Sequence, residues 1–393
     1  MPKVSVGILR APEIRFSLSD DRIETVRFQD DCIAWHDNIY SELRFSPRFG
    51  DSFMLYDVVI GIGFHWERKE SQRFQGTLRF IVDNGQIQAI NDVDIEDYLL
   101  SVISSEMSGN ASDEFLKAHA VISRSWLLNR MSADNSAAGS SNNISEDRII
   151  RWYGHEVHKL FDVCADDHCQ RYQGISRAKE DIDKWNRIKR VIYATHGRVL
   201  TYEGKVCDTR FSKCCGGMLE EYENCWEDCH HPYLISKPDP YCNTHDINIL
   251  SQVLNNYDQE TVDFYRWRVE YSIEHISELV SRKSGIDFGV IKDMIPIKRG
   301  PSGRIYELKI VGTNRSVVVG KELEIRKWLS ESHLYSSAFT IKKTDDSFIL
   351  HGKGWGHGVG LCQIGAAVMG DQGYTYKEIL QYYYPNTQIE KLW

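Results

Sequence analysis

The stretch between Ile95 and Met107 does most to constrain the fold of this chain. Its apolar residues recur at the spacing of one helix face: Ile95, Leu99, Val102 and Ile103. Asp94 precedes them where a helix N-cap belongs, so the spacing predicts a helix over 95–107. The same apolar stripe, continued by one turn, reaches Glu106. An ionised carboxylate that leaves water must be paired or must take up a proton, so Glu106 is the residue that needs an explanation.

The pattern allows two interpretations of Glu106. Burial raises the pKa of a carboxyl group, which suits a general acid near neutral pH. A buried structural salt bridge satisfies the same pattern, and pattern alone favours it.

A second helix is predicted from Ser112 to Arg130, and it carries Lys117 and Arg124 seven residues apart, hence on one face. These two cations either form a solvated basic stripe or face Glu106 across the two helices.

The length and charge of the chain exclude several classes of protein. With 393 residues, the chain is long enough for two or three lobes. A net charge of −9 argues against nucleic acid as a partner, and no apolar run approaches the ~20 residues of a transmembrane segment. The N-terminus lacks the basic and long apolar segments of a signal peptide and is predicted as a strand. Either the chain stays inside the cell or its export signal is missing from this sequence.

Residues 1–90 alternate between apolar and polar side chains and are interrupted by turn residues. The alternation predicts an N-terminal β module with short strands near residues 4–8, 14–18, 25–28, 53–60 and 77–82. The last of these strands ends at Asp83-Asn84-Gly85, which is typical of a two-residue hairpin turn.

A smaller α/β lobe is predicted over 246–345. Two amphipathic helices, roughly 259–282 and 321–330, accompany strands such as 305–311. Before this lobe, the small polar residues of 132–147 predict a surface loop. The expected fold class is α+β, with a mixed helical and β core, the N-terminal β module and the smaller inserted lobe.

Glycine stands at every second position from Gly352 to Gly360, between an apolar strand and a predicted helix. The Gly-x-x-x-x-Gly-Lys-Ser/Thr pattern of a phosphate loop is absent. Trp355 and His357 in this segment suit stacking on a sugar and hydrogen bonding to it. A tight structural turn, with Trp355 in the core, explains the same residues.

The ten cysteines are unevenly distributed. Cys32 and Cys362 stand alone. Six others crowd one stretch: Cys207, Cys214, Cys215, Cys225, Cys229 and Cys242. Clustered cysteines indicate disulfides or metal, depending on the compartment. The spacing of Cys225–His231 allows a metal, but disulfides or plain thiols are favoured there.

An earlier stretch combines cysteines with histidines. Two histidines and two cysteines within about a dozen residues can complete a tetrahedral metal shell. The preferred set is His158, Cys164, His168 and Cys169, with His155 as a spare. A Cys164–Cys169 disulfide or two free thiols explain the same residues without a metal.

Several motifs, taken together and in order, resemble those of one family. They are Ile95-Glu-Asp-Tyr-Leu with Ser105-Glu106-Met107, Leu116-Lys-Ala-His-Ala-Val with Arg124, Phe161-Asp-Val-Cys-Ala with His168-Cys-Gln and Tyr172, Ser302-Gly-Arg304, Gly354-Trp-Gly-His-Gly-Val-Gly-Leu-Cys-Gln363 with Gly365-Ala, and Gly373-Tyr with Ile379-Leu and Tyr382-Tyr-Tyr-Pro385. From about residue 90 to its end, the chain resembles the stage II sporulation protein D (SpoIID/LytB) family of peptidoglycan enzymes.

The resemblance implies a lytic transglycosylase that cleaves MurNAc–GlcNAc bonds in glycan strands stripped of their stem peptides, forming 1,6-anhydroMurNAc. The family's catalytic Glu falls on Glu106. The residues expected to bind substrate are Lys117, Arg124, Tyr172, Trp355, His357 and Gln363. In some members of the family a His/Cys cluster binds zinc, and this cluster falls on His158, Cys164, His168 and Cys169. This set predicts one structural zinc ion per chain, since four protein ligands leave no position for a catalytic water.

The resemblance also suggests how the chain is divided. The expected parts are a β module (1–90), a catalytic core with the metal cluster (91–245), the smaller lobe (246–345), and a glycine-rich loop with a C-terminal helix that completes the core (346–393). Two departures from the family are His119, where Gln is usual, and Cys214-Cys215, where Ser or Thr are usual.

The expected partners are peptidoglycan glycan strands and an N-acetylmuramoyl-L-alanine amidase, and the expected location is the cell envelope. The LytB side of the family suggests an alternative, a non-catalytic glycan-binding modifier that enhances an amidase. The N-terminus keeps open a third interpretation, a cytoplasmic zinc-dependent protein of another activity.

Overall fold

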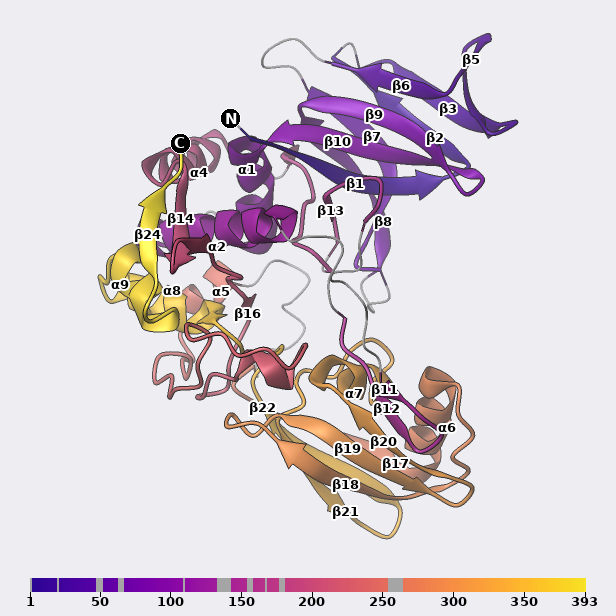
Figure 1. Cartoon of the computed structure of the whole chain (residues 1–393), viewed down its shortest axis with the longest axis vertical. Coiled ribbons are helices and arrows are strands. Elements are labelled where there is room, and N and C mark those ends of the chain that lie inside the picture. Colours follow the sequence, from indigo (N-terminus) through magenta and orange to yellow (C-terminus); the bar gives the residue numbers. More distant parts are fainter. Residues whose placement is uncertain are drawn as a thin grey trace.

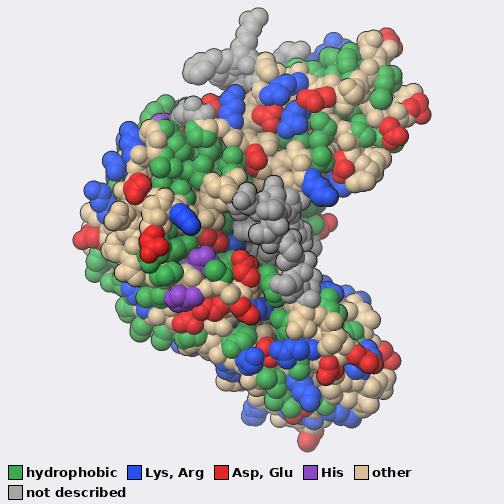
Figure 2. All heavy atoms as spheres, viewed as in Figure 1, with side chains coloured by type: hydrophobic (Ala, Val, Ile, Leu, Met, Phe, Trp, Pro, Cys, Tyr) green, Lys and Arg blue, Asp and Glu red, His purple; other side chains and the backbone are tan. Residues whose placement is uncertain are grey.

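Figure 1 shows the fold in a computed structural model. The structure describes residues 2–19, 21–46, 52–62, 67–108, 110–132, 143–153, 158–166, 168–176, 181–253 and 264–393. Strands and helices are mixed along the chain, which confirms the predicted α+β class. The molecule is C-shaped, with β sheets at one tip, helices in the middle and a smaller lobe at the other tip (Figure 1), and its concave side lies between the two tips (Figure 2). Within the described ranges, no helix is long and apolar enough to cross a membrane.

Two sheets pack face to face in the N-terminal β module. Their strand orders are β13-β1-β10-β9-β6 and β5-β4-β3-β2-β7-β8. The strands are β1 (Lys3–Ala11), β2 (Glu13–Ser17), β3 (Ile23–Gln29), β4 (Cys32–Trp35), β5 (Asn38–Tyr40), β6 (Glu42–Phe45), β7 (Ser52–Ile60), β8 (Arg68–Gln75), β9 (Thr77–Asp83), β10 (Gln86–Asp94) and β13 (Val163–Cys164). Phe16 of β2 packs on Phe45 of β6 and Phe80 of β9, with ring centroids 5.1 and 5.2 Å apart, so the two sheets share one core.

The strands predicted in this module are confirmed. They correspond to β1, β2, β3, β7 and β9, and the N-terminus is strand β1. The hairpin prediction also holds, because Asn84 (φ 45°) and Gly85 (φ 73°) form the two-residue turn between β9 and β10. Positive φ at both positions is the geometry that an Asn-Gly turn supplies.

The helical core follows directly from β10. The predicted helices are confirmed as α1 (Ile95–Glu106) and α2 (Asp113–Ser132). Asp94 holds the N-cap position of α1, but its side chain makes no capping hydrogen bond. The remaining elements are α4 (Ile182–Ala194), β14 (Arg198–Tyr202), β15 (Lys205–Val206), β16 (Phe211–Ser212), η1 (Tyr222–Asn224), α5 (Ile247–Val253), β23 (Leu361–Cys362), α8 (Gln363–Asp371), α9 (Tyr376–Tyr383) and β24 (Gln388–Lys391).

The smaller lobe has a hydrophobic core of its own. Its sheets have the orders β11-β12-β20-β19-β18 and β17-β22-β21. The elements are β11 (Asn143–Ile144), β12 (Arg148–Ile150), β17 (Arg266–Ser272), α6 (Ile273–Ser284), β18 (Ile291–Arg299), β19 (Ile305–Gly312), β20 (Ser316–Gly320), α7 (Glu322–Trp328), β21 (Phe339–Lys343) and β22 (Ser347–Lys353). The β module and the helical core share the other hydrophobic core. The division of the chain into four parts stays a prediction.

Two predictions in this region need correction. The helix expected over 259–282 begins only at α6, because Arg266–Ser272 alternates as strand β17 against β22 and Ser272 then caps the helix by accepting from His275 N–H. Residues 259–263 lie outside the described residues. The loop expected over 132–147 includes strand β11, which pairs with β12, and its residues 133–142 lie outside the described residues.

Candidate functional site

Glu106 is the last residue of α1, and only 9% of its surface is exposed. Its Oε1 accepts a hydrogen bond from the Arg171 backbone N–H at 3.3 Å. The neighbouring Ser105 Oγ accepts from Gln173 N–H at 3.1 Å. The segment 171–173 therefore runs along the C-terminal end of α1 and fixes the carboxyl group from the backbone. The structure thus places Glu106 on the buried face that the apolar stripe predicts.

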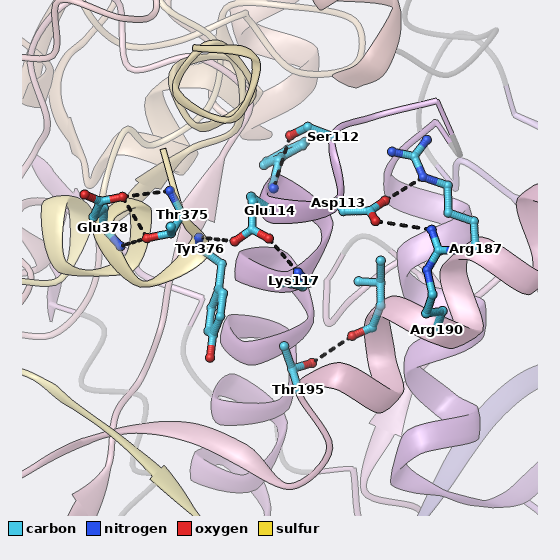
Figure 3. A network of polar contacts seen from close by, with 12 residues as sticks. Ser112, Asp113, Glu114, Lys117, Arg187, Arg190, Thr195, Thr375, Tyr376 and Glu378 are labelled. Carbon is cyan, nitrogen blue, oxygen red and sulfur yellow. Dashed lines mark hydrogen bonds and ion pairs between the residues drawn. The ribbon is translucent and has the colours of Figure 1, made fainter. Parts of the chain in front are cut away.

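Lys117 binds a different carboxylate from the expected one. Its Nζ donates to Glu114 Oε1 at 2.5 Å, and Glu114 Oε2 accepts from Tyr376 N–H at 2.7 Å (Figure 3). This pair ties α2 to the start of α9. Among the described residues, the carboxylate that Lys117 binds is Glu114, so the expected pair with Glu106 is not formed. Lys117 exposes 23% of its side chain, so a substrate can still reach it. Its role in substrate binding stays a prediction.

Arg124 is completely buried, which corrects its predicted role as a substrate ligand. Its guanidinium binds both carboxylate oxygens of Glu96, at 3.0 and 2.6 Å, and donates to the Arg198 carbonyl at 2.8 Å. Glu96 lies in the first turn of α1 and Glu106 in the last, about 15 Å away along the helix axis. A side chain with no exposed surface cannot touch a glycan strand, so Arg124 is a structural ion-pair partner.

We expect Arg124→Met to lower the free energy of unfolding by roughly 3–5 kcal/mol, because it leaves the Glu96 carboxylate buried without its cation. Adding Glu96→Leu should restore part of this loss, and urea denaturation measures both effects. The activity that the family resemblance predicts, cleavage of glycan strands, should be the same per folded molecule in the double variant as in the wild type. If Arg124→Met were as stable as the wild type but had lost cleavage, Arg124 would act on the substrate instead.

Tyr172 and Gln363 are also too deeply buried for the substrate contacts expected of them, since each exposes 2% of its surface. The Tyr172 hydroxyl donates to Asn91 Oδ1 at 2.5 Å, and its ring stacks on Tyr98 with centroids 5.0 Å apart. Gln363 Nε2 lies 3.3 Å from His119 Nε2 inside the core. Both predictions are corrected, because these side chains join helices and strands to one another.

His119 carries a pH-dependent stability effect. Burial, assisted by the charge of Lys213, lowers the pKa of His119 to about 3. The unfolded chain, with a His pKa near 6.5, therefore binds a proton between about pH 6.5 and pH 3 that the folded chain does not bind. Stability is fully present above pH 6.5 and falls as the pH drops through this window, by about 1.4 kcal/mol per pH unit.

We expect His119→Gln to remove this slope. Between pH 7 and pH 5, the wild type should lose about 2 kcal/mol more unfolding free energy than the variant, by urea denaturation at both pH values. The comparison between the two proteins cancels the contributions of the other histidines. Equal losses in both proteins would contradict the assignment.

The glycine-rich segment has the predicted order of strand, loop and helix, formed by β22, residues 354–360, β23 and α8. Trp355 is partly exposed, and its ring packs on Phe264 and Tyr335 with centroids 4.7 and 4.9 Å away. His357 Nδ1 accepts from Val359 N–H at 3.0 Å, and burial, with nearby arginines, holds the pKa of His357 well below its ordinary value. The imidazole is therefore neutral at neutral pH. Contacts of Trp355 and His357 with glycan stay predictions.

A turn of the smaller lobe holds the glycine-rich segment in place. A turn between β18 and β19 contains Arg304, which is completely buried. The Arg304 guanidinium donates to the Gly356 carbonyl at 2.9 and 3.1 Å and to the Cys215 carbonyl at 3.2 Å. A Cβ on Gly358 would lie 2.5 Å from this guanidinium, so the close packing requires glycine there. The Ser302-Gly-Arg304 motif therefore has a structural role, because its arginine holds the glycine-rich segment.

Hydrogen bonds connect the end of α1 to the same segment. Ser108 N–H donates to the Gln252 carbonyl at 2.9 Å, and Lys213 Nζ donates to the adjacent Val253 carbonyl at 2.5 Å. Cys214, next to Lys213, exchanges backbone hydrogen bonds with Trp355 at 3.1 and 2.7 Å. A strip formed by residues 252–253 and 213–214 thus connects the end of α1 to Trp355. The sequence did not indicate Lys213 as a residue of this strip.

The predicted metal ligands come together. One donor atom from each of His158, Cys164, His168 and Cys169 lies within 4.8 Å of all the others. Cys169 Sγ is 3.5 Å from both His158 Nε2 and His168 Nδ1, and Cys164 Sγ is 3.8 Å from His168 Nδ1. Tetrahedral zinc with ordinary bond lengths places such S and N atoms about 3.6 Å apart. The residues therefore fit zinc, while His155 lies outside the described residues.

The cluster is built on strand β1. Strand β13, which contains Cys164, pairs with Val6 and Gly7 of β1. A Cβ on Gly7 would lie 2.4 Å from the Phe161 ring, and this ring packs on His158 with centroids 4.7 Å apart. Hydrogen bonds from Cys169, His158 and His168 lower the pKa of the Cys164 thiol, which favours the thiolate that a metal needs. All ten cysteines lie in the described ranges as free thiols, so the Cys164–Cys169 disulfide is not formed.

A cavity of about 710 Å³ opens between the smaller lobe and the segment 222–230. Aromatic rings of Trp152 and Tyr306 line it together with the Lys321–Asp228 ion pair, whose N and O atoms are 2.7 Å apart. Such a mixed lining suits a polar ligand with hydrophobic faces. The sequence did not predict this cavity, because its walls come from stretches more than 150 residues apart.

With this geometry described, comparisons with known proteins identify the family. The family model described as "Stage II sporulation protein" matches residues 83–202, and another, "Domain of unknown function (DUF8618)", matches residues 220–360. An uncharacterized protein of Brachyspira hyodysenteriae is 32% identical over 318 residues, which cover 80% of this chain and 72% of that protein. Stage II sporulation protein D of Bacillus subtilis is 24% identical over 305 residues, covering 77% of this chain and 76% of that protein. The chain belongs to the stage II sporulation protein D family.

The family match covers both candidate functional groups of the chain. Its residues 83–202 include Glu106 at the end of α1 and all four residues of the His/Cys cluster. A further relative, the amidase enhancer of Bacillus subtilis, is 25% identical over 237 residues, covering 52% of this chain and 33% of that protein. The match to the domain of unknown function spans the smaller lobe and the glycine-rich segment.

Proposed function

We propose that this protein is a lytic transglycosylase that cleaves the MurNAc–GlcNAc bonds of peptide-stripped peptidoglycan strands. Membership of the stage II sporulation protein D family supports a role at the cell wall. The observation that carries the proposal is Glu106, a nearly buried carboxyl group at the end of an apolar helix, held by a backbone amide. Location in the cell envelope is part of the same proposal.

The chemistry needs a single carboxyl group. Glycoside hydrolysis ordinarily uses two carboxylates, one as the acid and one as the base or nucleophile. Here Glu106 donates its proton to the leaving glycosidic oxygen as the bond from C1 of MurNAc to that oxygen breaks. The C6 hydroxyl of the same sugar attacks C1, and its proton passes to the ionised Glu106. The new C1–O6 bond closes the 1,6-anhydro ring, and the intramolecular attack has a high effective molarity.

The hydrogen bond from Arg171 orients the carboxyl group of Glu106. Oε1 accepts the backbone N–H, which fixes the direction in which the group presents its proton. The donor lies two residues after Cys169, a member of the His/Cys cluster. A zinc ion held by His158, Cys164, His168 and Cys169 would have a complete shell and a structural role. It would hold the segment that supplies this hydrogen bond.

The test is incubation of the purified chain with denuded glycan strands, followed by mass spectrometry. A transglycosylase releases products that end in 1,6-anhydroMurNAc, whose mass is lower by one water than that of hydrolysis products. Hydrolysis products would point to a second carboxylate and contradict the proposed mechanism.

The similarity to the amidase enhancer of Bacillus subtilis favours one other function. A non-catalytic modifier would bind glycan, leave it unchanged and increase the rate of an N-acetylmuramoyl-L-alanine amidase. The same incubation separates the two functions, because unchanged glycan with measurable binding supports the modifier. Adding an amidase to the mixture then shows whether its rate rises.

A further inference from the structure

A second group of cysteines meets in the core, far from the His/Cys cluster in sequence. Cys214, Cys215, Cys242 and Cys362 are 0–1% exposed, and Asp239 beside them is 2% exposed. One donor atom from each of Cys215, Asp239, Cys242 and Cys362 lies within 4.8 Å of all the others. Cys362 stands alone in the sequence, 120 residues beyond Cys242, and only the fold brings it here.

The distances suit a metal shell. Cys215 Sγ lies 3.4 Å from Cys242 Sγ and 3.2 Å from Asp239 Oδ2. Tetrahedral zinc with ordinary bond lengths places two sulfurs about 3.8 Å apart and a sulfur and an oxygen about 3.5 Å apart. A disulfide joins sulfurs two at a time at about 2 Å. Here the Sγ atoms of Cys215, Cys242 and Cys362 all lie within 4.8 Å of one another, so three sulfurs meet rather than one pair.

A helix end and several hydrogen bonds orient the ligand atoms. Cys362 is the N-cap of α8, a helix of nine residues, whose positive end stabilises a thiolate. Cys215 N–H also points at Cys362 Sγ, at 3.3 Å. Asp239 is oriented by Tyr241 N–H on Oδ1 at 3.0 Å and by the Tyr383 hydroxyl on Oδ2 at 3.2 Å. Burial makes ionised thiols and a carboxylate costly at this position, and a bound cation would offset that cost.

We propose that Cys215, Asp239, Cys242 and Cys362 bind a second zinc ion, in a closed structural site. Thiolate sulfur with one carboxylate oxygen is a ligand set that zinc accepts, and the alkaline-earth ions are excluded because they bind oxygen ligands. Four protein ligands in a buried position leave no site for a catalytic water, so this ion stabilises the fold.

The position of the site gives it a structural purpose. The chain leaves the helical core after α5, which follows Cys242, builds most of the smaller lobe and returns to the core at Cys362. Strand β16 pairs in parallel with β23, and the residue after Cys362 begins α8. An ion bound here joins both ends of the inserted lobe. It also fixes the Cys214–Trp355 backbone pairing that holds the glycine-rich segment.

The test is zinc content per chain, measured by elemental analysis on protein purified under reducing conditions. We expect two ions in the full-length wild type, one in Cys164→Ser/Cys169→Ser and one in Cys242→Ser. Cys207→Ser, which alters a thiol of the same burial outside the cluster, should keep both ions. Co2+ replacing zinc in Cys164→Ser/Cys169→Ser should show thiolate-to-metal charge-transfer absorption that Cys362→Ser, added to this variant, removes.

Two results would overturn the proposal. The first is that the wild type holds a single ion and the Cys164→Ser/Cys169→Ser variant holds none. This result does not depend on whether Cys242→Ser folds. The other is a disulfide between any two of Cys214, Cys215, Cys242 and Cys362, found by alkylation and peptide mass spectrometry of the reduced-purified wild type. Protection of these thiols from alkylation until a chelator is added supports the site.

Discussion

Glu106→Gln should abolish the release of 1,6-anhydroMurNAc products while leaving the fold unchanged. The amide has the size of the carboxyl group, and its oxygen can still accept the hydrogen bond from Arg171 N–H that now reaches Oε1. It has no proton to donate and cannot take one from the C6 hydroxyl. Loss of a general acid typically costs on the order of 10²- to 10⁴-fold in rate, and here one group supplies both proton transfers, so we expect the upper end of that range. Mass spectrometry of products from denuded glycan measures the rate.

A matched control comes from the same helix. Asp97→Asn removes a half-buried carboxylate of α1 that has no part in the proposed reaction, and it should cleave at the wild-type rate. Thermal unfolding and glycan binding of Glu106→Gln should match those of the wild type. Wild-type release of anhydro products by Glu106→Gln would contradict the assignment. If the wild type does not cleave glycan, and the wild type and Glu106→Gln stimulate an amidase equally, the non-catalytic modifier is favoured.

Local sequence patterns predicted the elements whose geometry depends on near neighbours. The stripe that ends in Glu106 defined α1, and Asn84-Gly85 defined a hairpin because positive φ at two adjacent positions suits few other residues. The histidines and cysteines of 158–169 lie close enough in sequence to share one shell, so their spacing predicted the cluster that the structure contains. In each case the interaction spans about a dozen residues or fewer.

Local sequence patterns could not predict which distant segments pair with one another. Helical spacing places Lys117 and Arg124 on one face of α2, but it does not tell how α2 is rotated against α1. The fold turns Arg124 toward Glu96 and Lys117 toward Glu114, so neither binds Glu106. Cys362 joins Cys215 for the same reason, since parallel pairing of β16 with β23 decides it. The strand at 266–272 was predicted as helix because its pairing with β22 crosses more than 70 residues.

Cys169→Ser should remove one zinc ion per chain and slow glycan cleavage through the position of Glu106. Cys169 lies 3.5 Å from two of its three predicted co-ligands, and a hydroxyl is a poor replacement for a thiolate on zinc. The Arg171 amide that binds Glu106 Oε1 lies two residues further along the same segment. Without the ion this segment loses its anchor, and outer contacts of this kind are typically worth 10- to 100-fold in activity. Elemental analysis and the product assay measure the two effects.

The kinetic constants distinguish positioning from a general loss of structure. If the ion acts by holding the Arg171 amide on Glu106, Cys169→Ser lowers kcat and leaves KM close to the wild-type value. The smaller lobe has a core of its own, and Arg304 and Cys214 hold the glycine-rich segment independently of the ion. Cys164→Ser should behave in the same way, since it removes another ligand of the same shell. Cys32→Ser, in β4 of the N-terminal module, is the matched control and should keep the zinc content and both constants. An unchanged zinc content in Cys169→Ser, or no metal in freshly purified wild type, would contradict the His/Cys zinc site.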